Sequence, residues 1–112
     1  MAATIGFSNL LSAPDTLQGE LTEILARSRT VRVERIVSHG HVTSEGQWYD
    51  QDEHEWVAVL AGRARLRFDK GDVVELAPGD ALLIPAHERH RVEWTTPHTH
   101  TVWLAVFFTP DA

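Results

Sequence analysis

The stretch GQWYDQDEHEWVAVLAG, from Gly46 to Gly62, decides the fold and the candidate site. It places a carboxylate, Glu55, at the head of an apolar strand that ends at a glycine. Glu55 has the same strand parity as Val57 and Val59, so it shares a face with apolar side chains. A carboxylate on such a face is unfavourable unless it meets a cation, a metal ion or hydrogen-bond donors. We therefore expect Glu55 to line a cavity, the alternative being a solvent-facing carboxylate at the strand end.

A second stretch, PGDALLIPAHERHRVEW from Pro78 to Trp94, supplies a possible partner for this carboxylate. His90 follows a proline-bounded turn and begins an alternating strand, in which His90, Val92 and Trp94 are expected on one face. If both strands line one barrel, Glu55 and His90 converge on one point inside it. The alternative for His90 is a histidine that is simply hydrogen-bonded within the core.

Short strands separated by turns account for most of the chain after residue 30. The segment RARLRF, 63–68, alternates strictly, and the turn DKGD, 69–72, joins it to VVEL, 73–76, as a hairpin. Further turn signals lie at 77–80, at Pro85 and at 95–100. This pattern indicates an all-β fold, either a closed β-barrel or a jelly-roll sandwich.

The N-terminal residues give a different pattern. Residues 5–11 are apolar enough for a short edge strand or an arm. Four apolar residues then fall at helical spacing: Leu17, Leu21, Ile24 and Leu25. They predict one short amphipathic helix over residues 15–27 that covers the barrel, although Gly19 within it weakens the prediction.

Length and composition indicate one globular domain. The chain has 112 residues, of which 43% are hydrophobic and 23% charged. We expect a single domain over residues 1–112, with an arm and helix at 1–30 and the barrel at 31–109. The longest apolar run, 102–108, is too short to cross a bilayer, and no basic segment precedes a long apolar core at the N-terminus. We therefore expect a cytoplasmic protein.

Charge and residue usage exclude several kinds of site. A formal charge of -6 argues against sequence-independent nucleic-acid binding, and no membrane partner is expected. The absence of cysteine excludes disulfides, thiolate metal sites and cysteine nucleophiles. A metal site would therefore use histidine, carboxylate, amide or phenol ligands, and the chain has seven histidines.

Two spacings together resemble a known family. They are Glu55-(six residues)-Gly62 and Pro78-Gly79-(five residues)-Pro85-(four residues)-His90, which look like the two motifs of the cupin superfamily. The resemblance covers residues 31–109, and WYDQDEHEWV with IPAHERHRVEWT further resembles small single-domain bacterial cupins (cupin 2 type) without an assigned reaction. It implies a jelly-roll barrel, also called a double-stranded β-helix, which is commonly dimeric. It also implies a divalent metal held by two histidines and a glutamate of the first motif and one histidine of the second.

The chain departs from the family pattern at the first-motif histidines. Counting back from Glu55, these positions fall on Tyr49 and Gln51, or with a longer gap on Trp48 and Asp50. His54 is adjacent to Glu55, and neighbouring strand residues point to opposite faces. The metal ligands that the resemblance implies are therefore Glu55 and His90 with Gln51 as a third. Tyr49 or Asp50 could add a further oxygen, which would suit a hard cation.

Other residues are candidates for the ligand cavity. Arg35 falls on the apolar parity of VRVERIV, 31–37, so either the strand is bulged or two-sided, or Arg35 faces the cavity and clamps an anionic ligand. Trp48, Tyr49 and Trp94 are expected to form aromatic walls of the pocket. His87 lies in a turn near the mouth, where a solvent-facing position is the alternative.

Two more histidine pairs have the i, i+2 spacing that puts both rings on one side of a strand. They are His39 with His41 and His98 with His100. The first pair, followed by Glu45, even has the spacing of the family motif, but no apolar strand and glycine come after it. We expect both pairs at the surface.

Two function hypotheses follow. The first is a small cupin-type barrel that binds a divalent metal or a small polar organic ligand and acts as a dioxygenase, isomerase or lyase. The second is a non-catalytic ligand-sensing or storage barrel, or a dimerising interaction module, with a degenerate metal site. In either case we expect a homodimer, since the last strand, TVWLAVFF at 101–108, is apolar on both faces, and we expect no nucleotide cofactor.

Overall fold

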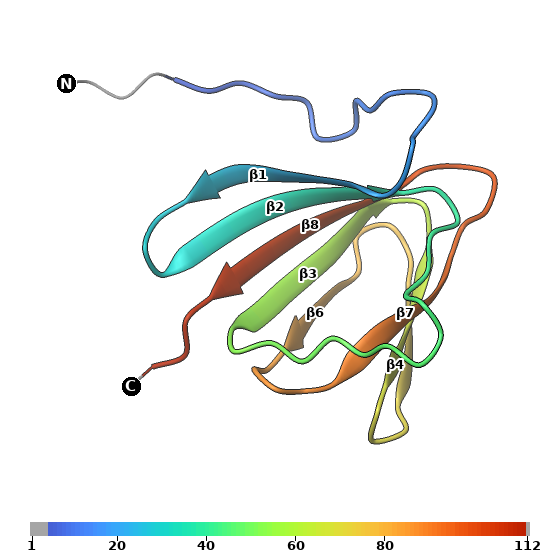
Figure 1. Cartoon of the computed structure of the whole chain (residues 1–112). Coiled ribbons are helices and arrows are strands. Elements are labelled where there is room, and N and C mark those ends of the chain that lie inside the picture. The colour runs from blue at the N-terminus through green and yellow to red at the C-terminus, as the bar shows by residue number, and fades with distance from the viewer. Residues whose placement is uncertain (1–4, 112) are drawn as a thin grey trace.

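The computed structural model describes residues 5–111 and contains eight β-strands and no helix within that range. The strands are β1 (Leu21–Arg27), β2 (Val31–Ser38), β3 (His54–Ala61), β4 (Ala64–Phe68), β5 (Val73–Leu76), β6 (Ala81–Ile84), β7 (His90–Thr95) and β8 (Thr101–Phe108). Figure 1 shows them as two layers. The all-β jelly-roll prediction is confirmed.

The two layers are antiparallel sheets. One has five strands in the order β1-β2-β8-β3-β6, and the other has three in the order β5-β4-β7. Side chains of alternating residues fill the space between them, including Val57 and Val59 of β3, Leu66 of β4 and Trp103 of β8. Because β8 lies in the centre of the larger sheet, it needs apolar residues on both faces, as its sequence has.

The predicted helix over residues 15–27 is wrong, because residues 21–27 form strand β1. This strand pairs with β2, from Leu21 opposite Val37 to Arg27 opposite Arg32. Leu17, Leu21 and Leu25 are spaced four residues apart. Residues at this spacing lie on one side of a regular strand and also on one face of a helix, so the pattern fits both. Pairing with β2 decides between the two, since tertiary context overrides local propensity.

Residues 5–20 form an arm without regular strand or helix structure, and Figure 1 shows it running beside β1. Two of its apolar residues, Ile5 and Phe7, are almost fully exposed. The arm is attached by the buried Arg35, whose guanidinium donates to the carbonyl oxygens of Leu10, at 3.1 Å, and Ser12, and pairs with Glu23.

Strand β2 is two-sided rather than bulged. Its register with β8 is continuous from Val31 to Ser38. Glu34 and Ile36 face the space between the sheets, while Arg35 lies on the opposite face with the arm. The interpretation of Arg35 as a cavity residue therefore does not match its position.

The turn between β3 and β4 depends on Gly62. Its φ of 74° is in the left-handed region, which side chains disfavour. A Cβ atom there would lie 2.6 Å from the Cα atom of Thr101. After this turn, Ala64, Leu66 and Phe68 are buried, and β4 pairs with β5 as the predicted hairpin.

A bulge in β7 reverses the predicted orientation of Trp94. Arg65 pairs with Trp94 and Leu66 with Val92, so the ladder skips Glu93. An extra residue moves every later side chain to the other face. As a result Trp94 points outward and is 36% exposed, and it does not share the face of His90 and Val92.

Candidate functional site

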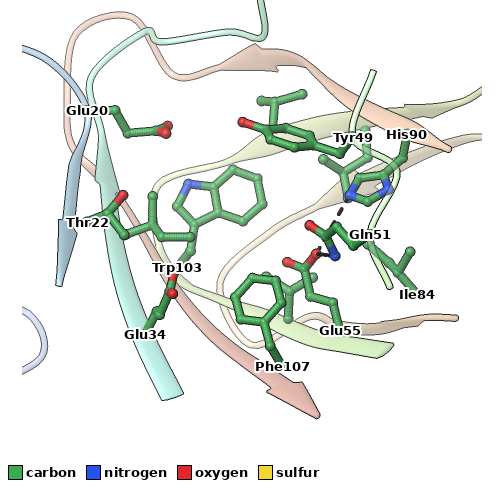
Figure 2. A pocket seen from close by; sticks show the side chains of 14 residues that line it. Glu20, Thr22, Glu34, Tyr49, Gln51, Glu55, Ile84, His90, Trp103 and Phe107 are labelled. Atoms are coloured by element: carbon green, nitrogen blue, oxygen red, sulfur yellow. Dashed lines mark hydrogen bonds and ion pairs between the residues drawn. The ribbon is translucent and has the colours of Figure 1, made fainter. Parts of the chain in front are cut away.

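A cavity of about 210 Å³ lies between the two sheets. Seven of its lining residues are polar, and the remainder are apolar, with Trp103 and Phe107 the largest. The polar ones are Glu20, Thr22, Glu34, Tyr49, Gln51, Glu55 and His90. Figure 2 shows Glu55, Gln51 and His90 on one side of the cavity and Glu20, Thr22 and Glu34 on the other.

Glu55 and His90 meet inside this cavity. They are 7% and 4% exposed, and the His90 Nε2 atom lies 3.7 Å from Glu55 Oε1. In the five-stranded sheet, Glu55 of β3 is paired with Ile84 of β6 on one side and with Phe107 of β8 on the other. The two stretches of sequence thus bring an acid and an imidazole together from different sheets.

His90 is fixed in position by hydrogen bonds on its other side. Its backbone exchanges two hydrogen bonds with Tyr49, of 2.7 and 3.1 Å. Its Nδ1 atom lies 2.8 Å from the carbonyl oxygen of Glu88. A carbonyl only accepts, so Nδ1 carries the hydrogen and Nε2 is the nitrogen that gains or loses a proton toward Glu55.

The environment favours the protonated form of His90. Burial by itself lowers the pKa of His90, but the carboxylate of Glu55 and the carbonyl of Glu88 together outweigh burial, and the pKa lies above the ordinary 6.5. The ion pair is present when Glu55 is ionised and His90 protonated. Nε2 of His90, which faces Glu55, is therefore the atom at which this buried pair takes up or releases a proton.

Two more residues extend the polar side of the cavity. The Gln51 amide donates to Glu55 Oε1 at 3.3 Å. The Tyr49 ring lies against the His90 ring, with centroids 5.5 Å apart. Burial raises the pKa of the Tyr49 phenol, and the charges of Glu20 and Glu55 raise it further. Tyr49 is therefore a neutral phenol at physiological pH.

The residues present do not fit a resident divalent ion. Catalytic metal centres generally have three protein ligands, and the described residues contain no cluster of three histidine, aspartate or glutamate side chains suited to one. Gln51 turns its NH₂ group toward Glu55, because a carboxylate accepts only, so the amide oxygen is not directed to the shared point. Tyr49 keeps its proton, and Asp50 is hydrogen-bonded to His87 instead.

Four other predicted cavity residues do not line it. The Trp48 ring packs against the guanidinium groups of Arg89 and Arg91, at 5.7 and 5.9 Å. His87 is exposed and contacts Asp50 at 2.8 Å. Arg35 binds the arm on the far face of β2, and the bulge in β7 turns Trp94 outward.

The remaining histidines lie away from the Glu55 site. His54 accepts a hydrogen bond from the backbone of Ala86 at 2.9 Å, so it does not replace the missing ligands. The backbone amide of His39 donates to the His41 ring. His39 also packs edge-on against His100, with centroids 5.2 Å apart.

Several cavity residues were missed by the sequence analysis. Glu34 was identifiable, because it shares strand parity with Ile36 and that face turned out to be the inner one. Trp103 and Phe107 could not be assigned to the cavity from parity, because β8 is apolar on both faces and its sequence does not mark the inner one. Glu20 could not have been found, since the residues around it were expected to be helical.

Comparisons with known proteins agree with this architecture. The family model of the cupin domain matches residues 33–107. A solved structure from Ralstonia eutropha, called a putative mannose-6-phosphate isomerase, is 36% identical over 95% of this chain and 100% of that one, with a TM-score of 0.90. A cupin superfamily protein from Desulfitobacterium hafniense is 21% identical over 88% and 84% of the two chains, with a TM-score of 0.72. The second similarity shows the fold alone.

No curated protein matches the chain. Within residues 5–111, no helix has the length and apolar character needed to cross a membrane. The matched residues, 33–107, run from strand β2 to strand β8 and cover about two thirds of the chain. The chain therefore belongs to the cupin domain family.

Proposed function

We propose that the cavity binds a small polar organic molecule and that His90 and Glu55 transfer protons to and from it, as in an isomerase or a lyase. The observation that carries this proposal is the buried acid–imidazole pair that faces the cavity. Ionisable groups that are buried together in a pocket are typical of acid–base sites. The volume of about 210 Å³ suits a metabolite smaller than a drug-sized ligand.

The geometry suggests different roles for His90 and Glu55. Neutral His90 presents the Nε2 lone pair to the cavity and can remove a proton from a carbon next to a carbonyl group. Protonated His90 can return a proton to an oxygen or to the neighbouring carbon. The Glu55 carboxylate stabilises the imidazolium formed in between, and Gln51 holds that carboxylate by a hydrogen bond.

The name of the Ralstonia structure supports this class of reaction. Sugar isomerisation moves a proton between neighbouring carbons, which requires a positioned acid and base. The similarity, 36% over nearly the whole of both chains, makes a related reaction a reasonable proposal for this chain. It does not by itself extend the named substrate to this chain.

Deuterium uptake tests the proposal, because it detects proton transfer at carbon whatever product is formed. Small hydroxy- and aminocarbonyl compounds, among them dihydroxyacetone, mannose and aminoacetone, are incubated with the protein in D₂O and analysed by mass spectrometry. We expect deuterium on carbon in at least one compound, above the level without protein. Binding without any exchange would favour the alternative, a non-catalytic sensing or storage barrel.

Elemental analysis tests the alternative in which the reaction depends on a bound divalent metal ion. A site formed by Glu55, His90 and Gln51 would give protein with stoichiometric metal that the His90→Ala variant has lost. The donor set leads us to propose instead that proton transfer does not depend on a bound ion. Equal, substoichiometric metal in both proteins is the result that fits this proposal.

We also propose that two copies pair through the outer face of the larger sheet. Leu83, Trp56, Val106 and Val33 form a row of cross-strand neighbours on that face. Trp56 is 39% and Leu83 is 55% exposed, although both are large and apolar. Exposed apolar residues in a contiguous row are typical of protein interfaces.

Light scattering after size-exclusion chromatography tests this interface. We expect the wild-type protein to have twice the mass of one chain, and Leu83→Asp to shift it toward the monomer, since a buried unpaired charge opposes association. Val73→Asp is the matched control, because Val73 is similarly exposed but lies on β5 in the other sheet. A monomeric wild-type protein would contradict the proposal.

A further inference from the structure

The side of the cavity opposite His90 carries a second group of polar residues. Glu20, Thr22 and Glu34 line it, and Figure 2 shows them across the aromatic rings of Trp103 and Phe107 from Glu55. Glu20 accepts a hydrogen bond from the Ser38 hydroxyl at 2.6 Å, which fixes one of its oxygens. The proton-transfer pair uses none of these residues.

The charges that line the cavity are mainly negative. They are the carboxylates of Glu20, Glu34 and Glu55 and the imidazole of His90, and in the described part of the chain no lysine or arginine lines the cavity. Arg32 stands at its edge, 4.4 Å from the centre of the Phe107 ring. It is already paired with Glu34 and Glu53, so two carboxylates offset its charge.

Glu55 has an oxygen atom with no partner in the protein. Its Oε1 atom is close to Gln51 and His90, but Oε2 receives no hydrogen bond from the residues that the structure describes. Every fully buried side-chain nitrogen or oxygen among these residues has a partner. Glu55 is 93% buried, so its free oxygen reaches the open space of the cavity, where a ligand can meet it.

The walls between the two polar ends are aromatic. The indole NH of Trp103 donates to the Ser38 hydroxyl at 3.1 Å, so the polar edge of this ring is already satisfied. Trp103, Phe107 and Tyr49 all line the cavity. Aromatic faces attract ammonium groups, and the attraction grows when the cation is desolvated.

We propose that the ligand of this cavity is a small cation, an amine or a quaternary ammonium compound, rather than a phosphorylated sugar. The inference rests on the proposed function and names its substrate class. The positive group lies among the aromatic rings near Glu20 and Glu34, and the other end of the molecule reaches His90 and Glu55. A phosphate in the same place would be repelled by the carboxylates, and the nearby guanidinium of Arg32 is already paired with Glu34 and Glu53.

Paired probes that differ in charge alone test this inference. Choline and 3,3-dimethyl-1-butanol have the same shape, but only choline is charged. Calorimetric titration of the wild-type protein is expected to give choline an affinity at least about tenfold higher, equivalent to about 1.4 kcal/mol. Inorganic phosphate and mannose 6-phosphate are expected to bind more weakly than choline.

Variants in which glutamates are replaced by neutral glutamines test which carboxylates bind the cation. In the double variant Glu20→Gln with Glu34→Gln, we expect choline to lose at least about tenfold in affinity, while 3,3-dimethyl-1-butanol is unchanged. Glu75→Gln is the control, because it removes a carboxylate that lies on β5 and does not line the cavity. An equal loss in the control would show a general charge effect and overturn the proposal.

The same titrations, followed by the NMR signals of the His90 ring, separate this inference from the proposed function. Shifted His90 signals without preference for choline would overturn the cation inference and leave the cavity as the binding site. If no probe binds or shifts His90, both proposals fail. Preference for choline with shifted His90 signals supports both.

Discussion

In the His90→Gln protein, the exchange of substrate carbon-bound hydrogen with D₂O is expected to be about 10²–10⁴-fold slower than in the wild-type protein. Glutamine can still hydrogen-bond to Glu55, but it cannot accept a proton at physiological pH. The loss should therefore appear in the rate at saturating substrate more than in the substrate concentration needed for half-maximal rate. Mass spectrometry of substrate samples taken over time measures both.

His87→Gln is the matched control for this prediction. His87 is exposed, and it contacts Asp50 at the surface instead of the cavity. We expect its exchange rate to stay within about twofold of the wild-type rate, as for a surface substitution away from the site. A His90→Gln protein as active as this control would rule out His90 as the proton-transfer group.

Gly62→Ala is expected to reduce the free energy of unfolding by about 3 kcal/mol or more. The alanine Cβ would clash with the Thr101 hydroxyl oxygen and would lie 2.6 Å from the Thr101 Cα atom. The backbone of β8 cannot move away without disturbing its pairing with β2 and β3. The left-handed conformation adds about 1–2 kcal/mol to this clash.

Gly46→Ala separates the cost of the left-handed backbone conformation from the cost of the steric clash with Thr101. Gly46 has a φ of 78°, close to the 74° of Gly62, but nothing lies within 4 Å of the Cβ position. Urea unfolding should show a loss of about 1–2 kcal/mol for Gly46→Ala, which is the conformational part alone. Equal losses at the two glycines would mean that the close approach to Thr101 has no effect on stability.

The core of the candidate site was accessible from the sequence because it depends on simple periodicity. Glu55 shares parity with Val57 and Val59, and all three are buried on the inner side of β3. The bounds of β3 and β4, with the turn at Gly62, follow from the same alternation. Alternation is reliable where one face of a strand is buried and the other is exposed.

The outward position of Trp94 could not be predicted because one extra residue in β7 changes which face is the inner one, and for Arg35 the sequence left both faces of β2 open. The bulge at Glu93 leaves no signal in the sequence that distinguishes it from regular alternation. Arg35 is buried by the arm, and this contact exists only after residues 5–20 fold back over the sheet. Both depend on pairing between distant segments, which a local pattern does not contain.

The N-terminal segment shows the same limit. Leu21 and Leu25 fit one face of a helix and one side of a strand equally well, and the edge of β2 decides between them. As a consequence, Glu20 and Thr22 were not considered for the site, although they form the side of the cavity opposite His90.

The central claim is that Glu55 and His90 interact within the cavity, and NMR titration of isotopically labelled histidines tests it most directly. The His90 signal is identified by its loss in His90→Gln. We predict a His90 pKa above the ordinary 6.5 in the wild-type protein. In Glu55→Gln the pKa should fall, because burial still opposes the charged ring while the carboxylate that favours it is gone. A pKa that is the same in both proteins would contradict the account.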